Sequence, residues 1–462
     1  MKRFLWLGFV LSLYLICSGC GETFRPIIIP NPPVFPNPKA AHTVLSINDN
    51  APSVGQPEAV AGTAMVVDVS GDTDVSVVNV GLAPVHAMQQ TANQVLVVNH
   101  SATGALADSI TKLTFNSILI SGSSTISLPA NSAPNFVAST ESSQAYVSLP
   151  SYVPDPINNP GVVVPSVGVV NTNSNSLTNT IPVGINPVAI AEMPNSQKLY
   201  VANQGDNTVR GFNTVDRSAR TTLTFSAPVW LIARSDSQRL YVLNGPGGAS
   251  PGVVSTVDTT STAGPDTVID ASVTAPGAAY MLYDGNLNRL YIPGGDQLTM
   301  LDVSQSVPTP VTGTPIAIPT VQPGSRTASG DPCSTTAPAS LNTVAVTSLP
   351  DGSRAYVGSY YEDLSNNICP QVTVIDAVSH TIKSQIAIPG FPAFDTFCSA
   401  SRFRLMMAAA GDSSRAYLSS CDGGNVNIID TSTDTYIGNL PAPVGSRLQN
   451  PPQNPVFLIA GP

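Results

Sequence analysis

Four aspartates at matching positions in the second half of the chain are candidates for acid–base chemistry or metal binding. Each ends a β-prone run, as in Val372-Thr373-Val374-Ile375-Asp376, and the set is Asp258, Asp302, Asp376 and Asp430. Carboxylates that converge on one point transfer protons or bind a cation. An aspartate at a strand end also accepts hydrogen bonds from the backbone two residues on. Because the four recur at one place in a repeat, we expect turn capping.

Few other residues suit catalysis. The histidines number four, and they are scattered: His42, His86, His100 and His380. The chain contains no Gly-x-Ser-x-Gly motif, no His-Glu-x-x-His motif and no phosphate-binding loop. Lone histidines in such a pattern more often pack or face solvent. We therefore assign no catalytic residue, no metal ligand and no cofactor, and lean towards a protein that is not an enzyme.

One short segment has the composition of a binding site. Tyr360, Tyr361, Glu362 and Asp363 place two aromatic rings beside two carboxylates. Such a group could stack on a sugar ring or hold a peptide. The alternative is a solvated loop held in place by the nearby Cys369. We expect the segment in a long connection over residues 358–370, because loops on a rigid scaffold commonly carry binding sites.

A phrase that recurs seven times predicts the elements that position these residues. A polar turn leads into a small or apolar residue and then Tyr-Val or a close substitute. The phrase is centred on Leu96, Tyr146, Tyr200, Tyr241, Tyr291, Tyr356 and Tyr417. In the most compact copy, four short β-prone runs are separated by Gly, Asn, Asp, Ser and Pro. Four antiparallel strands per repeat predict an all-β fold, a β-propeller, with a parallel β-helix as the second choice.

The motifs Tyr200-Val201-Ala202-Asn203 and Val372-Thr373-Val374-Ile375-Asp376 resemble the YVTN family of β-propeller repeats. The similarity covers roughly residues 80–440, and Leu96 departs from it where the family has tyrosine. The resemblance implies a cell-surface or secreted scaffold. It implies no activity, because the family is defined by a structural repeat. Related propellers include lactonases and quinone-dependent dehydrogenases.

The ends of the chain predict how the ring closes. Residues 454–460 read as a first strand without successors, and residues 63–69 and 74–80 read as later strands without a first strand. Joined together, they would complete one blade and remove two open sheet edges. This count favours eight blades over seven within a propeller that spans residues 42–462.

The repeat also orders the cysteines. Cys333 and Cys398 fall before first strands, whereas Cys369 and Cys421 fall after second strands. In a four-stranded meander, both kinds of connection emerge on one face. We predict disulfide bonds Cys333–Cys369 and Cys398–Cys421, each within one copy, and the competing pairing joins neighbouring copies.

The N-terminal region predicts export and anchoring. Residues 1–19 have charged residues at the start and a 12-residue apolar stretch, as in a signal peptide. The segment ends in Cys17-Ser18-Gly19-Cys20, which resembles a bacterial lipobox, so Cys20 would carry a lipid. Residues 20–41 form a Pro-rich spacer. We expect an exported lipoprotein at the outer membrane or cell surface, and the alternative is an ordinary cleaved leader on a secreted protein.

Composition limits the partners. Charged residues make up 10% of the chain and the net charge is −10, which argues against nucleic acid as a ligand. The leading expectation is a non-catalytic, surface-anchored propeller that binds a protein, peptide or glycan through its loop-rich face. An enzyme of the lactonase or quinone-dependent dehydrogenase type and a structural envelope or adhesion component are the alternatives.

Overall fold

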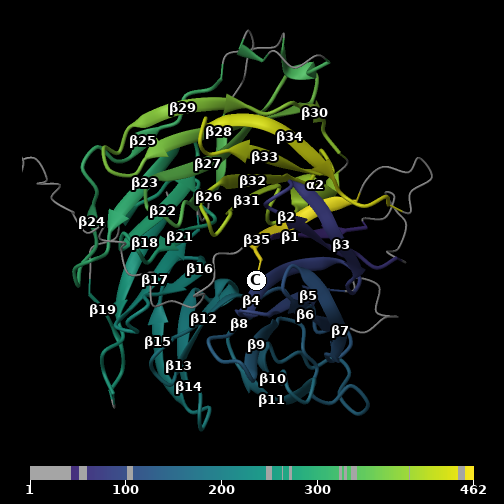
Figure 1. Ribbon diagram of the computed structural model, residues 1–462. Coiled ribbons are helices and arrows are strands. Elements are labelled where there is room, and N and C mark those ends of the chain that lie inside the picture. Colours follow the sequence, from purple (N-terminus) through teal and green to yellow (C-terminus); the bar gives the residue numbers. More distant parts are fainter. Residues whose placement is uncertain are drawn as a thin grey trace, which may run out of the picture. The chain divides into compact units, whose positions relative to one another are not determined.

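The strands of a computed structural model form a β-propeller of eight antiparallel blades, which confirms both the predicted fold and the favoured blade number (Figure 1). The structure describes residues 43–50, 60–100, 108–245, 252–262, 264–269, 273–321, 325–326, 330–334, 341–394, 396–445 and 453–461. The signal peptide, Cys20 and the spacer lie outside these residues. No helix among the described residues has the length and apolar character needed to cross a membrane.

The two ends of the described chain build one blade together, as predicted. Its strands, from the ring axis outwards, are β35 (Asn454–Ala460), β1 (Thr43–Asp49), β2 (Thr63–Asp68) and β3 (Thr73–Asn79). The sequence reading had missed β1 because its apolar run lacks the tyrosine of the repeated phrase. The pairing of β35 with β1 removes the open edge that either end would otherwise present.

The other seven blades follow one another along the chain. The second and third blades are β4 (Pro84–Thr91), β5 (Gln94–Asn99), β6 (Ser109–Asn116) and β7 (Leu119–Ser127), then β8 (Val137–Ala138), β9 (Gln144–Leu149), β10 (Ser166–Asn171) and β11 (Ser176–Pro182). The fourth blade is β12 (Pro187–Glu192), β13 (Lys198–Asn203), β14 (Thr208–Asn213) and β15 (Ala219–Thr224), with the short 3-10 helix η1 (Gln204–Asp206).

In the fifth and sixth blades the outermost strand is split in two. These blades are β16 (Pro228–Ala233), β17 (Arg239–Asn244), β18 (Val253–Asp258), β19 (Thr267–Val268) and β20 (Val273–Thr274), then β21 (Leu282–Asp284), β22 (Arg289–Gly294), β23 (Gln297–Asp302), β24 (Thr309–Pro310) and β25 (Ile316–Ala317). Both outer segments pair with the third strand of their blade.

The seventh and eighth blades carry the four disulfide cysteines. Their strands are β26 (Leu341–Ser348), β27 (Arg354–Glu362), β28 (Asn367–Asp376), β29 (Ile382–Ala387) and β30 (Phe391–Pro392), then β31 (Leu405–Ala409), β32 (Arg415–Ser420), β33 (Asn425–Asp430) and β34 (Thr435–Pro441). The 3-10 helix η3 (Pro332–Ser334) precedes β26, and helix α2 (Thr396–Ala400) precedes β31.

Burial falls from the inside of a blade to its rim. The second strands β13 and β17 are buried at every residue, whereas the outermost strands β7 and β34 alternate between exposed and partly buried residues. Six tyrosines of the repeated phrase are almost completely buried: Tyr146, Tyr200, Tyr241, Tyr291, Tyr356 and Tyr417. The phrase therefore marks the packing surface between neighbouring blades, where aromatic and β-branched side chains fill the most space.

At several positions the phrase also joins one blade to the next. The Tyr200 hydroxyl donates a hydrogen bond of 2.7 Å to Asp266, between β18 and β19 of the following blade, and Lys198 Nζ lies 2.8 Å from the same carboxylate. Tyr356 and Arg354 contact Asp434 in the same way. The sequence reading had not assigned these carboxylates, although the basic residue two positions before each tyrosine was a visible signal.

The two faces of the ring differ in their connections. We call the insertion face the one on which second strands lead to third strands and each blade leads to the next. It includes residues 150–165, 363–366 and 388–404. We call the opposite one the turn face, and it includes residues 193–197 and 377–381. The connection over residues 358–370 named in the sequence analysis reaches the insertion face by this topology.

Candidate functional site

The innermost strands enclose a cavity of about 570 Å³ on the ring axis. Every blade contributes to its wall, and one lining residue from each is His86, Val137, Ile190, Leu231, Leu282, Thr347, Met407 and Leu458. The wall also includes residues near the ends of these strands, such as Glu192 and Ala460, so the cavity lies towards the turn face. Its position opposite the insertions was not expected from the sequence.

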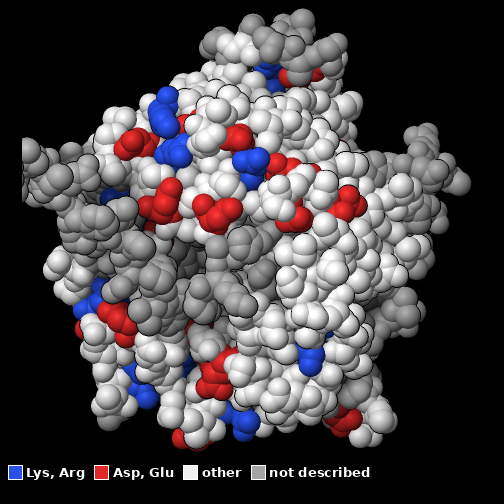
Figure 2. Space-filling view, viewed as in Figure 1, with Lys and Arg blue, Asp and Glu red and all other residues white. Residues whose placement is uncertain are grey.

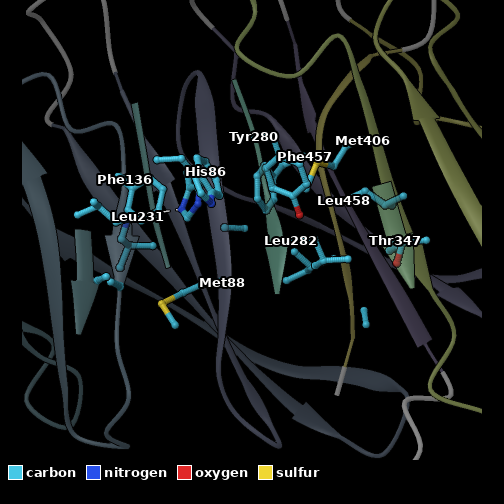
Figure 3. A pocket seen from close by; sticks show the side chains of 18 of the residues that line it. His86, Met88, Phe136, Leu231, Tyr280, Leu282, Thr347, Met406, Phe457 and Leu458 are labelled. Carbon is cyan, nitrogen blue, oxygen red and sulfur yellow. Dashed lines mark hydrogen bonds between the residues drawn. The ribbon is translucent and has the colours of Figure 1, made fainter. Parts of the chain in front are cut away.

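A cluster of aromatic rings forms one end of this cavity (Figure 3). His86 stacks on Phe136 with ring centroids 4.1 Å apart, and Trp230 meets Tyr280 edge-on at 5.0 Å. Phe403 lies 5.9 Å from Trp230 and 5.1 Å from Phe457, which joins the two halves of the cluster. The aromatic residues come from first strands or the connections before them, so their convergence is a product of ring closure.

Arg402 lies on this cluster at the insertion face. Its guanidinium donates hydrogen bonds of 2.8 and 2.9 Å to the carbonyls of Val188 and Val229, near the starts of β12 and β16. The guanidinium carbon lies 4.8 Å from the centroid of the Trp230 ring, in cation–π geometry. The cavity is lined by the residues that follow along these strands, so Arg402 and the cavity occupy opposite sides of the aromatic layer.

Three titratable side chains of the cavity wall have shifted pKa values, and burial raises that of Tyr280. Burial and the nearby Arg402 charge hold the pKa of His86 well below its ordinary value, and its Nδ1 accepts a hydrogen bond from the Val137 amide at 3.4 Å. Burial raises the pKa of Glu192 to about 7, although its Oε2 accepts a 2.6 Å hydrogen bond from the Thr140 amide. Burial thus favours the uncharged form of all three side chains.

A three-residue metal site is not formed in this cavity by the described residues. Within them, the group that meets a metal-ligand spacing is Cys333, Asp363 and Cys369, and both of its sulfur atoms belong to one disulfide bond. Among the described residues that line the cavity, Glu192 carries the one carboxylate. Paired carboxylates, the arrangement that general acid–base hydrolysis uses, are therefore not seen there.

The four repeated aspartates cap turns, as expected. The carboxylate of each accepts a hydrogen bond from a backbone amide two residues on, for example Asp302 from Ser304 and Asp376 from Val378. The same holds for Asp258 and Asp430. Because these hydrogen bonds favour the ionised form, the pKa values of Asp302 and Asp376 are lowered.

The placement of the tyrosine-rich segment differs from the expectation. Tyr360, Tyr361 and Glu362 continue β27 and pair with β28, so residues 358–370 form an extended hairpin rather than a long loop. Tyr361 is fully buried under Arg326, Tyr360 lies beneath the guanidinium of Arg404, and Glu362 is exposed. The Tyr-Glu-Asp composition of this segment resembles a loop and conceals the extension of the strand.

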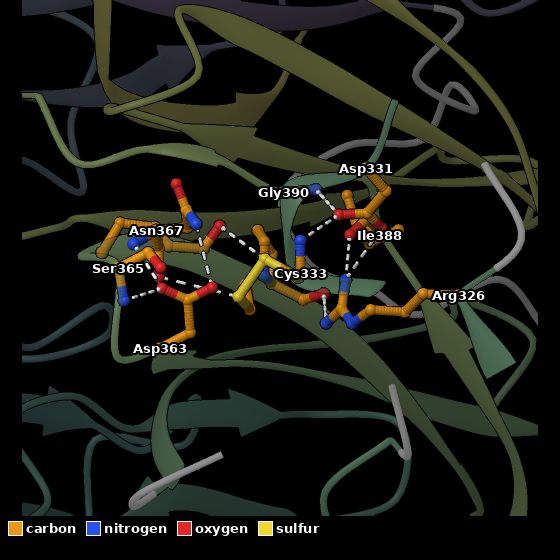
Figure 4. The surroundings of a disulfide bond; sticks show 11 residues. Arg326, Asp331, Cys333, Asp363, Ser365, Asn367, Ile388 and Gly390 are labelled. Atoms are coloured by element: carbon orange, nitrogen blue, oxygen red, sulfur yellow. Dashed lines mark hydrogen bonds and ion pairs between the residues drawn. A yellow bond between two sulfur atoms is a disulfide. The ribbon is translucent and has the colours of Figure 1, made fainter. Parts of the chain in front are cut away.

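Asp363 closes the tip of this hairpin (Figure 4). It is buried, and its Oδ1 accepts hydrogen bonds of 2.8 Å from the amides of Ser365 and Asn367. Its other oxygen accepts one from the Asn367 side chain at 2.9 Å. Of the four predicted binding residues, Asp363 therefore shapes the turn, and the exposed apolar residue at the tip is Leu364.

Two disulfide bonds lie on the insertion side of the last two blades. Cys333 is bonded to Cys369 and Cys398 to Cys421, each pair within one blade. Around the first bond, Asp331 Oδ1 accepts hydrogen bonds from the backbone amides of Cys333 and Gly390 (Figure 4). Arg326 donates hydrogen bonds to the carbonyls of Ile388 and Pro370. The bond thus ties the connection that enters the seventh blade to the base of its hairpin. Disulfide bonds are typical of exported proteins.

Comparison with known proteins identifies relatives of the fold. Neither a protein-family model nor a curated protein matches the chain. Among solved structures, apo AztD from Citrobacter koseri aligns with a TM-score of 0.57 at 11% identity, covering 91% of this chain and 98% of that one. Dihydro-heme d1 dehydrogenase NirN, in complex with DHE, aligns with a TM-score of 0.59 at 12% identity, covering 94% of this chain and 78% of that one.

The likeness is one of fold. Identities of this size show a shared β-propeller architecture and carry neither ligand nor activity from one protein to another.

Proposed function

We propose that this protein is an exported, lipid-anchored propeller of the YVTN type that binds a protein, peptide or glycan without catalysis. The observation that carries the proposal is the exposure of large apolar side chains on the insertion face. Ile157 is 88% exposed in the connection between β9 and β10, and Leu364 is 87% exposed at the tip of the β27–β28 hairpin. Loops that a folded scaffold positions commonly carry binding residues.

The hairpin beneath Leu364 is held by a disulfide bond and by a buried aspartate. Leu364 stands on a hairpin whose base is crosslinked by Cys333–Cys369 and whose turn is closed by Asp363. A preorganised support lowers the entropy lost on binding. Figure 2 shows that charged side chains occur singly or in small groups between wide uncharged areas. A surface of this kind, with a net charge of −10, fits uncharged or weakly charged partners and argues against nucleic acid.

The enzyme alternative has less support. A hydrolase or dehydrogenase needs converging acid, base or cofactor-binding groups, and the described cavity wall offers Glu192 and a neutral His86. A structural envelope or adhesion role remains the second candidate, because it would use the same exposed face without a soluble ligand.

Matched variants on the two faces test the proposal. Leu364→Ser and Ile157→Ser change the insertion face, and Val378→Ser changes a residue of 81% exposure on the turn face. We expect the double variant Leu364→Ser/Ile157→Ser to capture about tenfold less partner from envelope extracts than the parent protein. Val378→Ser should capture as much as the parent protein. Equal capture by all three proteins would contradict binding through the insertion face.

Anchoring has its own experiment. Cys20→Ser should move the protein from the membrane fraction to the soluble fraction after cell lysis, while the parent protein stays with membranes. Metabolic labelling with a fatty acid should mark the parent and leave the variant unlabelled. Continued membrane association of the variant would argue against a lipid at Cys20.

A further inference from the structure

The axial cavity combines an apolar interior with one buried carboxylate near the turn face. Its volume of about 570 Å³ falls within the range of small-molecule sites. We propose that it binds a lipophilic amine, with the apolar body against the aromatic cluster and the protonated amino group at Glu192. This site is separate from the insertion face and does not depend on the function proposed above.

The interior suits an apolar body. Met88, Leu231, Leu282 and Leu458 belong to the apolar wall, and Met406 lies beside Phe457 at the aromatic end (Figure 3). Thioether side chains adapt to ligands of different shape, and the edges and faces of Phe136, Trp230 and Tyr280 provide a flat apolar end. An apolar ligand body has no hydrogen bonds with water to give up when it enters this part of the cavity.

The positions along the strands orient the ligand. Glu192 is the last residue of β12, and its partner Thr140 likewise lies beyond the end of β8, so both are on the turn-face side of the cavity. The aromatic residues lie deeper, next to Arg402 and the starts of the strands. An amphipathic molecule would therefore enter with its apolar part first and leave its charged group at Glu192.

The charged side chains around the cavity determine which sign of ligand charge it favours. Glu192 is 6% exposed and forms no ion pair with any described residue. The nearest acidic neighbour, Glu141, adds negative potential rather than neutralising it. The guanidinium of Arg402 lies beyond the aromatic layer, where two backbone carbonyls accept its hydrogen bonds. A buried carboxylate without a basic partner favours a cation, since an anion would meet uncompensated repulsion.

Three probes of the same shape test the proposal with the whole protein. They are biphenyl-4-ylmethylamine, the corresponding alcohol and the corresponding carboxylate, and binding is measured by titration calorimetry at pH 8. We expect the amine to bind about tenfold more tightly than the alcohol, and the carboxylate not to bind. Fluorescence of Trp230, which lies in the cavity wall, gives a second signal.

Two variants separate charge recognition from cavity filling. Glu192→Gln keeps the shape of the side chain, so the amine should lose its advantage while the alcohol binds as before. Met88→Trp narrows the cavity and should weaken both ligands. Thermal unfolding and the propeller's circular dichroism spectrum check that both variants fold.

Several outcomes would overturn the proposal. They are equal affinity for amine and alcohol, preferred binding of the carboxylate, undiminished amine binding by Glu192→Gln, or no binding of any probe. Loss of partner capture by the insertion-face variants has no bearing on these results, because those residues lie on the other side of the aromatic layer.

Discussion

The hydroxyl of Tyr200 donates a 2.7 Å hydrogen bond to the buried carboxylate of Asp266, which lies in the next blade and 66 residues further along the chain. Lys198 reaches the same carboxylate and two backbone carbonyls beside it. The basic residue and the tyrosine of the repeated phrase thus hold one outer turn of the following blade. The phrase therefore supplies contacts between neighbouring blades as well as marking strands.

The first prediction concerns the Tyr200–Asp266 hydrogen bond between blades. Tyr200→Phe should lower the free energy of unfolding by about 1–2 kcal/mol, because it removes a hydrogen bond to a buried charged group. The matched control is Tyr241→Phe. Tyr241 holds the same position in the next copy, but its hydroxyl is buried near Arg234 without a hydrogen bond of normal geometry to a described residue. Denaturant unfolding should separate the two variants, and equal losses would contradict the role given to Asp266.

The second prediction concerns ring closure. Asp72, next to β3, accepts hydrogen bonds of 2.9 Å from both Arg415 and Tyr417 of the eighth blade. Asp72→Asn should reduce stability by about 1 kcal/mol, a modest value because both charged side chains are partly exposed. The N-terminal strands should also become more sensitive to limited proteolysis.

Asp74→Asn is the control for ring closure. It makes the same chemical change at an exposed position two residues away, and no ion pair joins Asp74 to a described residue. Its unfolding temperature and proteolysis pattern should match the parent protein. Indistinguishable behaviour of the Asp72 and Asp74 variants would show that this contact does not hold the ring closed.

The third prediction concerns the Cys333–Cys369 bond, which closes a loop with a sequence separation of 36. Replacing both cysteines by serine should destabilise the protein by up to about 4 kcal/mol, the chain-entropy value for a loop of this length. Peptide mapping without reductant should recover Cys333 linked to Cys369 in the parent protein. A linkage of Cys333 to Cys398 or Cys421 would contradict the pairing.

The fourth prediction concerns pH. Burial raises the pKa of Glu192 to about 7 from an ordinary value of 4.5, so between these values the folded protein binds more protons than the unfolded chain. The contribution of Glu192 to stability should therefore be fully present below about pH 4.5 and fall by up to about 3 kcal/mol as pH rises to 7. Glu141 and Tyr146 face this group, and the pKa of Tyr146 is raised beyond the working range.

Glu192→Gln tests the pH dependence. The variant should match the parent protein in unfolding temperature near pH 5 and exceed it near pH 8, because glutamine never ionises. A difference that stays constant between these two pH values would contradict the shifted pKa.

Much of the fold could be predicted from the sequence. A recurring phrase marks strands through local patterns of apolar and polar residues, and the incomplete runs at the two ends indicate the shared blade. β1 is not predicted because Val44-Leu45-Ser46-Ile47 lacks the tyrosine of the repeated phrase. The hairpin around Tyr361 was misplaced because its acidic and aromatic residues resemble a loop, whereas pairing with β28 makes it a strand.

The candidate sites depended on contacts that no local pattern records. Tyr417 meets Asp72 across a separation of 345 residues, and the aromatic cluster joins His86 to Phe403 and Phe457 by way of Trp230. By itself the sequence determined the repeated blade, its turn-capping aspartates and the joining of the chain ends, since each follows from neighbouring residues and their period. Only the tertiary structure decided which carboxylate meets which tyrosine and which side chains face the axis, because ring closure sets those distances.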